Sequence, residues 1–214
     1  MPPLTPTIVY ADEAVIVADK PAGLLSMPAG GGARNDCLAS RVQALYPDAL
    51  LVHRLDMATS GLIMLARGHE MLRCMNLAFE QRIVGKKYCA VVHGHMTEEQ
   101  GEITLPLGSD PDNPPRQKVD PLHGRPARTR YRVLARSGAG DDARTRVELT
   151  LYTGRTHQLR VHLLSIGHPI IGDPLYAPLA EAGREPRMCL HATSLAFIHP
   201  RTRLPACFDS PVPF

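Results

Sequence analysis

The chain reads Val52-His53-Arg54-Leu55-Asp56-Met57-Ala58-Thr59-Ser60-Gly61-Leu62 about a quarter of the way along its length. One acidic residue stands between a basic pair and a Thr-Ser-Gly turn, and the apolar run 62–66 follows directly. A carboxylate presented on such a loop can act as a nucleophile or as a general base. The simpler reading of an aspartate in this setting is a turn cap or a surface ion pair. The rest of the sequence has to decide between these readings.

Length and composition restrict the class of protein. A chain of 214 residues is long enough for one well-packed domain. Its hydrophobic fraction of 44% and charged fraction of 21% are ordinary for a globular protein. No apolar run is long enough for a membrane span, and the N-terminus lacks the basic start and apolar core of a secretory signal. The five cysteines are scattered without a C-x-x-C pair, which favours reduced thiols in the cytoplasm.

Positive charge is concentrated in one segment. From Arg116 to Arg160 there are eleven lysines and arginines against four acidic residues, although the whole chain carries only +3. Phosphate neutralisation supplies most of the non-specific affinity for nucleic acids, so the segment predicts a nucleic-acid partner. The alternative is a solvated face whose arginines bind nothing.

Hydrophobic periodicity predicts an α+β fold with a mainly antiparallel sheet. A helix is expected with apolar residues at Leu38, Val42 and Leu45, and a second helix at 69–83 with a stripe of Met71, Met75, Ala78 and Phe79. The prolines of 107–126 predict an irregular loop there. Strands are expected at 7–10, 15–18, 62–66, 87–93, 131–135 and 147–151.

The nonapeptide His53-Arg54-Leu55-Asp56-Met57-Ala58-Thr59-Ser60-Gly61 closely resembles the catalytic motif of the RluA family of RNA pseudouridine synthases. The aspartate of that motif is the family's essential residue, and it corresponds to Asp56. The resemblance therefore implies that Asp56 is catalytic, and it extends from about Ile8 to Pro200.

Three further segments resemble the same family. Lys86-Lys87-Tyr88-Cys89-Ala90 is similar to its K-x-Y-x-A segment, which implies that Tyr88 stacks against the target base. The run 153–163, Thr-Gly-Arg-Thr-His-Gln-Leu-Arg-Val-His-Leu, resembles the GRTHQLR segment, and the arginine that pairs with the catalytic carboxylate corresponds to Arg160. The Leu190-His191-Ala192 stretch implies that Leu190 walls the base pocket.

The implied chemistry explains these residue types. Converting uridine to pseudouridine is redox-neutral and gains no atom, so we expect no cofactor. Ten histidines raise the question of a metal site, but no H-E-x-x-H or Cys/His cluster is present, and we expect no metal. The target base must be extruded from folded RNA, and Arg54 is placed to fill the vacated stack, since a guanidinium plane stacks on bases.

Two other classes of function remain as alternatives. A non-catalytic protein that binds structured RNA could use the same basic face, but it would not need Asp56, Tyr88 and Arg160 together. A hydrolase using Asp56 with His157 would need a nucleophile elbow or paired carboxylates, which the sequence lacks.

The sequence thus predicts a single catalytic pseudouridine synthase domain over residues 1–214, with no separate N-terminal RNA-binding domain. The motif wording and Arg116-Gln117-Lys118-Val119 are most similar to the family's short, dual-specificity type. That type implies 23S rRNA, a tRNA anticodon stem-loop, or both as substrates. We expect a cytoplasmic monomer with RNA as its partner and no association with membranes.

Overall fold

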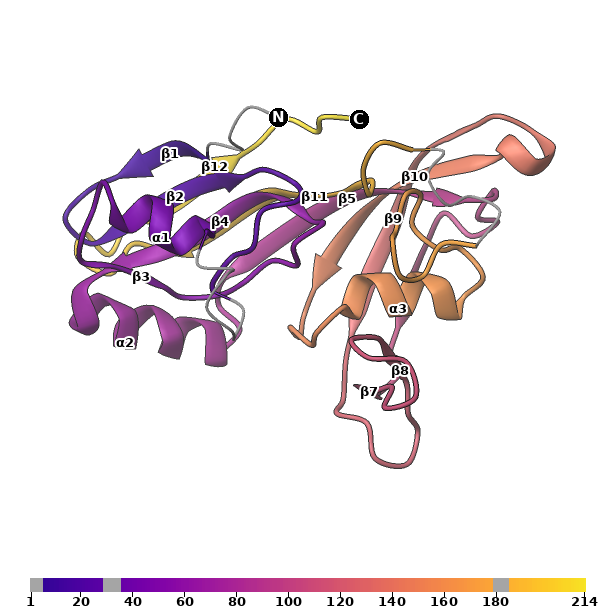
Figure 1. The fold of residues 1–214 in the computed structure, drawn as a ribbon, viewed down its shortest axis with the longest axis horizontal. Coiled ribbons are helices and arrows are strands. Elements are labelled where there is room, and N and C mark those ends of the chain that lie inside the picture. The colour runs from indigo at the N-terminus through magenta and orange to yellow at the C-terminus, as the bar shows by residue number, and fades with distance from the viewer. Residues whose placement is uncertain (1–5, 29–35, 179–184) are drawn as a thin grey trace. The chain divides into compact units, whose positions relative to one another are not determined.

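A computed structural model describes residues 6–28, 36–178 and 185–214 of the chain. Its helices and strands are shown in Figure 1 and are, in order, β1 (Thr7–Ala11), β2 (Val15–Lys20), α1 (Leu38–Gln43), β3 (Ala49–Leu51), β4 (Ser60–Arg67), α2 (Gly68–Glu80), β5 (Gly85–His93), β6 (Gln100–Ile103), β7 (Leu107–Ser109), β8 (Gln117–Val119), β9 (Thr129–Ser137), the 3-10 turn η1 (Gly140–Asp142), β10 (Arg144–Leu151), α3 (Gln158–Ser165), β11 (Leu190–Ile198) and β12 (Pro205–Asp209).

The chain divides into two compact units. Unit 1 combines Met1–Lys86 with His191–Pro213, and unit 2 consists of Lys87–Leu190 with Phe214. The prediction of one catalytic domain stays a prediction.

The sheet of unit 1 has the strand order β1-β2-β4-β11, with β12 paired to β11 and β3 paired to β4. These pairs are antiparallel, except that β4 and β11 run parallel. Residues 14–18 and 62–66 on the two central strands are almost wholly buried. Strands covered on both faces read as continuous apolar runs, and both segments do so.

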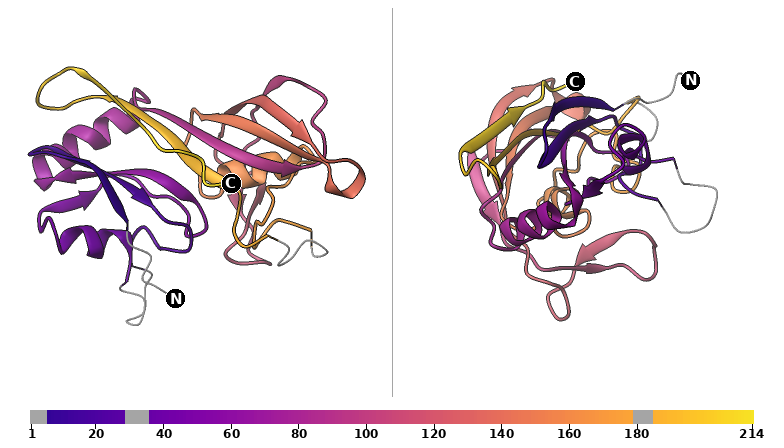
Figure 2. Two further views of the ribbon diagram at one scale, coloured as in Figure 1. Left: turned by 90° about the horizontal axis from the view of Figure 1, so that it is seen from above. Right: turned by 90° about the vertical axis from the view of Figure 1, so that its left-hand side faces the viewer.

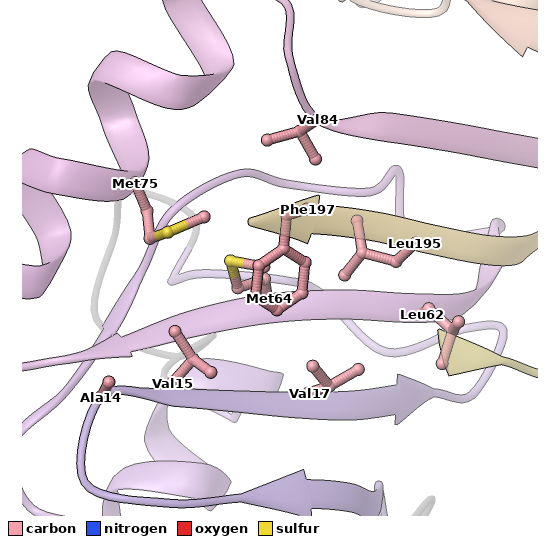
Figure 3. Close-up of a cluster of buried hydrophobic side chains, with 9 residues drawn as sticks. All are labelled: Ala14, Val15, Val17, Leu62, Met64, Met75, Val84, Leu195 and Phe197. Atoms are coloured by element: carbon pink, nitrogen blue, oxygen red, sulfur yellow. The ribbon is translucent and has the colours of Figure 1, made fainter. Parts of the chain in front are cut away.

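Figure 3 shows the core of unit 1, in which side chains of β2, β4 and β11 meet Met75 of α2 and Val84. Met71, Ala78 and Phe79 pack partly buried against this cluster, which confirms the predicted helical stripe. The helix ends at Glu80, earlier than predicted, and Arg82 just beyond it takes a left-handed φ of 60° that cannot continue a helix.

The first predicted helix is shorter than its apolar pattern indicated. Leu38 and Val42 are completely buried, as expected, but Leu45 is 68% exposed because α1 ends at Gln43. Cys37 forms the N-terminal cap, with its sulfur accepting a hydrogen bond from the Ser40 backbone N–H.

The main sheet of unit 2 has the antiparallel strand order β5-β10-β9-β6. The helix α3 packs on one face of it, where Gln158 and His162 both reach Thr129 of β9. The irregular loop predicted at 107–126 is wrong in part, because β7 and β8 form a small antiparallel sheet within it. This hairpin extends away from the rest of unit 2 in Figure 1 and in the right-hand view of Figure 2.

Strands in runs with three interspersed helices confirm the predicted α+β class with a mainly antiparallel sheet. None of the described helices is long and apolar enough to cross a membrane. The five cysteines are all free thiols.

Candidate functional site

Asp56 lies in unit 1 on the loop between β3 and β4, and it is half-buried. The residue before it, Leu55, is held through both of its backbone polar groups. The Ser26 hydroxyl donates to the Leu55 carbonyl at 2.7 Å and accepts from the Leu55 N–H at 3.0 Å. One side chain from a distant segment therefore fixes the chain on the N-terminal side of Asp56.

The residue after Asp56 is held by a buried lysine. The ammonium group of Lys20, which is 0% exposed, donates to the carbonyls of Pro21, Leu24 and Met57 at 3.0, 2.7 and 3.1 Å. The Gly23 N–H donates to the Met57 carbonyl as well, at 2.8 Å. Both neighbours of Asp56 are thus fixed to the segment 20–26. A group held in this way is preorganised for chemistry, because little reordering is needed when substrate binds.

His53, which opens the loop, is a structural residue. Its Nε2 atom accepts a hydrogen bond of 3.0 Å from the Met64 N–H, and its ring stacks on Phe79 with a centroid distance of 4.9 Å. Burial, with a smaller effect from the nearby Lys86, lowers the pKa of His53 to about 3. A neutral ring is also what the bond from Met64 requires, since only an unprotonated nitrogen accepts.

The C-terminal end of the loop is joined to β11 and β12. Ser60 Oγ lies 2.7 Å from His191 Nδ1, His191 Nε2 lies 2.9 Å from Ser210 Oγ, and Ser210 donates to Asp19 of β2. Next to Ser60, Gly61 has φ +109°, and a Cβ there would lie 2.3 Å from the carbonyl oxygen of Ala192. Only glycine permits this close approach of the parallel strands β4 and β11.

Arg160 lies in unit 2 on α3 and is 3% exposed. Its Nε and Nη2 atoms both donate at 2.7 Å to the two carboxylate oxygens of Asp173, in a bidentate pair. The guanidinium also stacks over the Tyr176 ring, 4.9 Å from its centroid. Asp173 in turn accepts from the backbone N–H groups of Leu175 and Tyr176. Arg160 is therefore held rigidly, and its predicted pairing with Asp56 stays a prediction.

Other polar residues of the segment 153–163, which contains Arg160, form the turn into α3. Gln158 accepts from Thr153 Oγ1 and the Arg155 N–H, and its amide donates to Thr129. His162 Nε2 lies 2.9 Å from the Leu105 carbonyl, which can only accept, so this nitrogen carries the proton and Nδ1 accepts from Thr129. Burial lowers the pKa of His162 and favours the neutral ring that this network needs.

The remaining predicted site residues differ in exposure. Tyr88 is 6% exposed on β5, opposite Leu149 of β10. Leu190 begins β11 and is 3% exposed. Arg54 is exposed on the HRLD loop of unit 1. Asp56 and Arg54 therefore belong to unit 1, and Tyr88, Arg160 and Leu190 belong to unit 2.

Within the ranges that the structure describes, no group of three or more His, Cys, Asp or Glu residues is arranged to hold a metal ion.

Comparison with known proteins assigns the chain to a family. Residues 14–165 match the family model described as RNA pseudouridylate synthase. The chain belongs to that family. The resemblance of the HRLD motif is thereby confirmed, and the synthase falls in the enzyme class of isomerases.

Curated relatives match the synthase along its full length. It is 46% identical over 215 residues to the dual-specificity RNA pseudouridine synthase RluA of Pasteurella multocida, covering 100% of this chain and 97% of the relative. The protein of the same name from Vibrio cholerae is 45% identical, with 94% and 81% covered. The one from Escherichia coli O157:H7 is 41% identical, with 100% and 97% covered.

Solved structures agree on the fold. The human RNA pseudouridylate synthase domain containing 1 has a TM-score of 0.83 and 28% identity, with 99% of the synthase and 85% of the human chain covered. The human domain containing 4 has a TM-score of 0.73 and 24% identity, with 97% and 88% covered.

The sequence did not reveal the residues that hold the site together. Lys20 and Ser26, which fix the loop around Asp56, lie 36 and 30 residues upstream of it. Asp173, the partner of Arg160, lies 13 residues beyond it and outside the segment 153–163. No pattern of spacing marks Lys20, Ser26 or Asp173, so these contacts appear only in the structure.

Proposed function

We propose that the synthase isomerises specific uridines to pseudouridine in 23S rRNA, in a tRNA anticodon loop, or in both, with Asp56 as nucleophile or general base. The observation that carries the proposal is the half-buried carboxylate of Asp56 on a loop whose backbone is fixed on both sides by Lys20 and Ser26. The words "dual-specificity" in the names of its relatives support two classes of RNA.

The reaction needs few chemical groups. The N1–C1′ bond of uridine breaks, the uracil turns, and C5 bonds to C1′, after which C5 loses a proton and N1 gains one. Electrons and atoms balance, so the reaction consumes no redox partner and no group donor. Asp56 can attack the ribose or the base covalently, or it can remove the 2′ proton on a path through a glycal.

Two residues of unit 2 complete the proposed machinery. Tyr88 would stack on the uracil and keep the detached ring in place, a role suited to an aromatic side chain within an ordered sheet. Arg160 would pair with the carboxylate of Asp56. Its bidentate bonds to Asp173 support this role, because they fix the guanidinium in one orientation. Arg54 and Leu190 would contact the RNA, Arg54 by entering the stack that the extruded base leaves and Leu190 by walling the base pocket.

RNA is thus the proposed partner, and we propose a cytoplasmic monomer that needs neither metal nor nucleotide. The concentration of arginine in 116–160, eleven basic residues against four acidic ones, supports RNA as the ligand.

The direct test is release of tritium from RNA labelled at C5 of uridine, because that hydrogen is lost when C5 joins C1′. Asp56→Asn should abolish release and leave RNA affinity within a few-fold of the original, since the carboxylate contributes little to phosphate binding. Asp112→Asn, a change of the same kind at an exposed position, serves as the matched control and should retain activity. Appreciable release by the Asp56→Asn protein contradicts the assignment. Binding of RNA without release by the unchanged protein would instead support the non-catalytic alternative.

A further inference from the structure

The outer face of the unit 2 sheet contains a hollow of about 360 Å³. The hollow lies over strands β5, β10 and β9 and the residue that follows β10. We call it the outer basic hollow; its lining residues are Lys87, Arg130, Tyr131, Arg132, Glu148, Thr150 and Tyr152. Its volume falls within the about 300–1,000 Å³ typical of small-ligand sites.

Strand register explains how these residues come together. Lys87 of β5 and Arg130 of β9 both stand opposite Thr150 of β10, and Arg132 stands opposite Glu148. Side chains directly opposite one another share a face of the sheet, and alternate residues share that face along a strand. The charged residues therefore form two adjacent rows across the strands, on one face of the sheet: Lys87, Thr150 and Arg130 in one row, and Glu148 and Arg132 in the next.

The opposite face of the same strands is the one that α3 covers. Tyr88 and Leu149 stand opposite each other, at the register positions between the charged rows, and are buried. Thr129 stands opposite Leu151, which lies two residues beyond Leu149 and on the same face, and Thr129 bonds to Gln158 and His162 of α3. The outer basic hollow thus opens on the side of the sheet away from α3, and it is separate from Tyr88 and Arg160.

Charge in the hollow is unbalanced. Glu148 accepts from Lys87 and from Arg132, each at 3.2 Å. Burial raises the pKa of Glu148, but these bonds and the two positive charges together outweigh burial and lower it, so Glu148 is ionised at neutral pH. One carboxylate thus faces three cations. In the part of the chain that the model describes, Arg130 makes one hydrogen bond, of 3.4 Å, to the Gln100 side-chain oxygen.

The rim adds an aromatic ring without adding net charge. Arg128 forms a bidentate pair with Glu102 at 3.0 and 2.8 Å and lies over the Tyr152 ring, 4.5 Å from its centroid. Lys87 and Arg132 remain open to solvent, with 53% and 58% of their side chains exposed. An anion can reach these groups from solution, and two guanidinium groups suit the forked geometry of phosphate oxygens.

We propose that the outer basic hollow binds backbone phosphates of the RNA substrate at a point remote from the modified uridine. The proposal rests on the proposed function in taking RNA as the ligand, and charge complementarity identifies the phosphodiester as the group bound. An RNA that engages Tyr88 and Arg160 on the α3 side must pass an edge of the sheet to reach the hollow. A long substrate can use both surfaces, whereas a minimal stem-loop reaches only one.

The test compares the affinity of two RNAs, a full-length tRNA transcript and the anticodon stem-loop cut from it, measured by fluorescence anisotropy over a series of salt concentrations. Arg130→Gln and Arg132→Gln should each weaken tRNA binding several-fold and reduce its salt slope by about 0.7 to 0.9 per lost phosphate contact. The stem-loop affinity should change by much less. Glu148→Gln should have the opposite effect and tighten tRNA binding, because it removes the only carboxylate among the residues that line the hollow.

Arg73→Gln is the matched control, since it removes one exposed arginine from α2 in unit 1. Thermal unfolding of every variant checks the fold. Equal weakening on both RNAs, an effect of Arg73→Gln as large as that of Arg130→Gln, or unchanged tRNA binding in all variants overturns the proposal. Binding is scored without reference to catalysis. A protein that makes no pseudouridine therefore contradicts the proposed function while leaving this test valid.

Discussion

Lys20 and Met57 are separated by 37 residues in the sequence, and the ammonium group of Lys20 donates a hydrogen bond of 3.1 Å to the Met57 carbonyl. The same ammonium binds two further carbonyls within its own segment. A fully buried cation is costly unless its donors are satisfied, and these carbonyls supply the acceptors. The bond makes the loop that carries Asp56 an integral part of the unit 1 core.

We expect Lys20→Met to destabilise the protein. The change leaves the carbonyls of Pro21 and Leu24 without this donor, and each buried unsatisfied acceptor costs about 1–3 kcal/mol. The free energy of unfolding in urea should fall by about 2–4 kcal/mol. Lys118→Met, at a lysine whose side chain is 46% exposed, is the control and should change it by about 0.5 kcal/mol or less. A small loss at Lys20 equal to that control would show that the buried bonds contribute little.

Arg160→Met should also destabilise the protein, in addition to any effect on catalysis. The substitution leaves the carboxylate of Asp173, whose side chain is 0% exposed, without its cation. Breaking a buried pair in this way costs about 3–5 kcal/mol. The double variant Arg160→Met/Asp173→Asn should recover part of the loss, because it removes the isolated charge. A double-mutant cycle of urea unfolding measures this coupling, and strictly additive losses would contradict it.

His53 should make stability depend on pH. Its pKa is lowered to about 3 in the folded protein, so between that value and about 6.5 the unfolded chain takes up a proton that the folded chain does not. Its contribution is fully present above about pH 6.5 and is lost as the pH falls toward about 3, with a slope of at most about 1.4 kcal/mol per pH unit.

His53→Gln can keep an acceptor for the Met64 N–H without titrating. Urea unfolding between about pH 7 and about pH 5 should therefore show a shallower dependence in this variant. His162, whose pKa is also lowered by burial, will leave some dependence in both proteins. Identical slopes for the two proteins would assign the pH dependence to other groups.

Gly61→Ala should be far more damaging than Gly68→Ala. Both glycines have positive φ, +109° and +73°, so both changes introduce backbone strain. A Cβ at Gly61 also lies 2.3 Å from the Ala192 carbonyl oxygen, whereas a Cβ at Gly68 meets nothing within 4 Å. We expect about 1–2 kcal/mol at Gly68 and failure to fold stably at Gly61. Similar melting temperatures for the two variants would show that β4 and β11 can separate without loss.

Arg54→Ala tests the proposed extrusion of the target base. Extrusion costs a few kcal/mol of stacking, and an inserted guanidinium recovers part of it. The variant should lose most single-turnover activity on a structured loop and less on an RNA whose uridine is already unstacked. Arg73→Ala, at another exposed arginine, should affect neither substrate. An equal loss on both RNAs would indicate that Arg54 only supports its own loop.

The parts of the fold that the sequence predicts are those with a clear hydrophobic pattern. The buried side chains of α2 recur at helical spacing, and β2 and β4 are short, continuous apolar runs, as expected of strands buried on both faces. The helix α3 was missed because six of its residues, Gln158 to Leu163, are all buried, so polar and apolar positions do not alternate by exposure. Its polar side chains are satisfied by β9 and by Asp173, which no local pattern reveals.

The candidate site shows the same division. Asp56 can be predicted because its loop resembles a family motif, and the chain belongs to that family. Outside the site, the apolar pattern predicts that Leu45 lies in the core, but Leu45 is exposed because α1 ends two residues before it. The pairing of Arg160 with Asp173 and the bonds of Lys20 depend on contacts across the fold, and such contacts cannot be derived from spacing.

Unit 1 is made of two segments of the chain, and these segments are synthesised at different times. The strands β11 and β12, which complete the sheet beside β4, are made after all of Lys87–Leu190. At about 5–20 residues per second, the nascent N-terminal half waits roughly 5–20 s on the ribosome for these partners. During that interval the start of β4, where Ser60 and Gly61 will pair with β11, has no strand on that edge, although β3 already covers the far end of the same edge. An open edge invites pairing with other chains. A circular permutant that places 191–213 ahead of β1 would remove the wait, and it should give a higher yield of folded protein when chaperones are limiting.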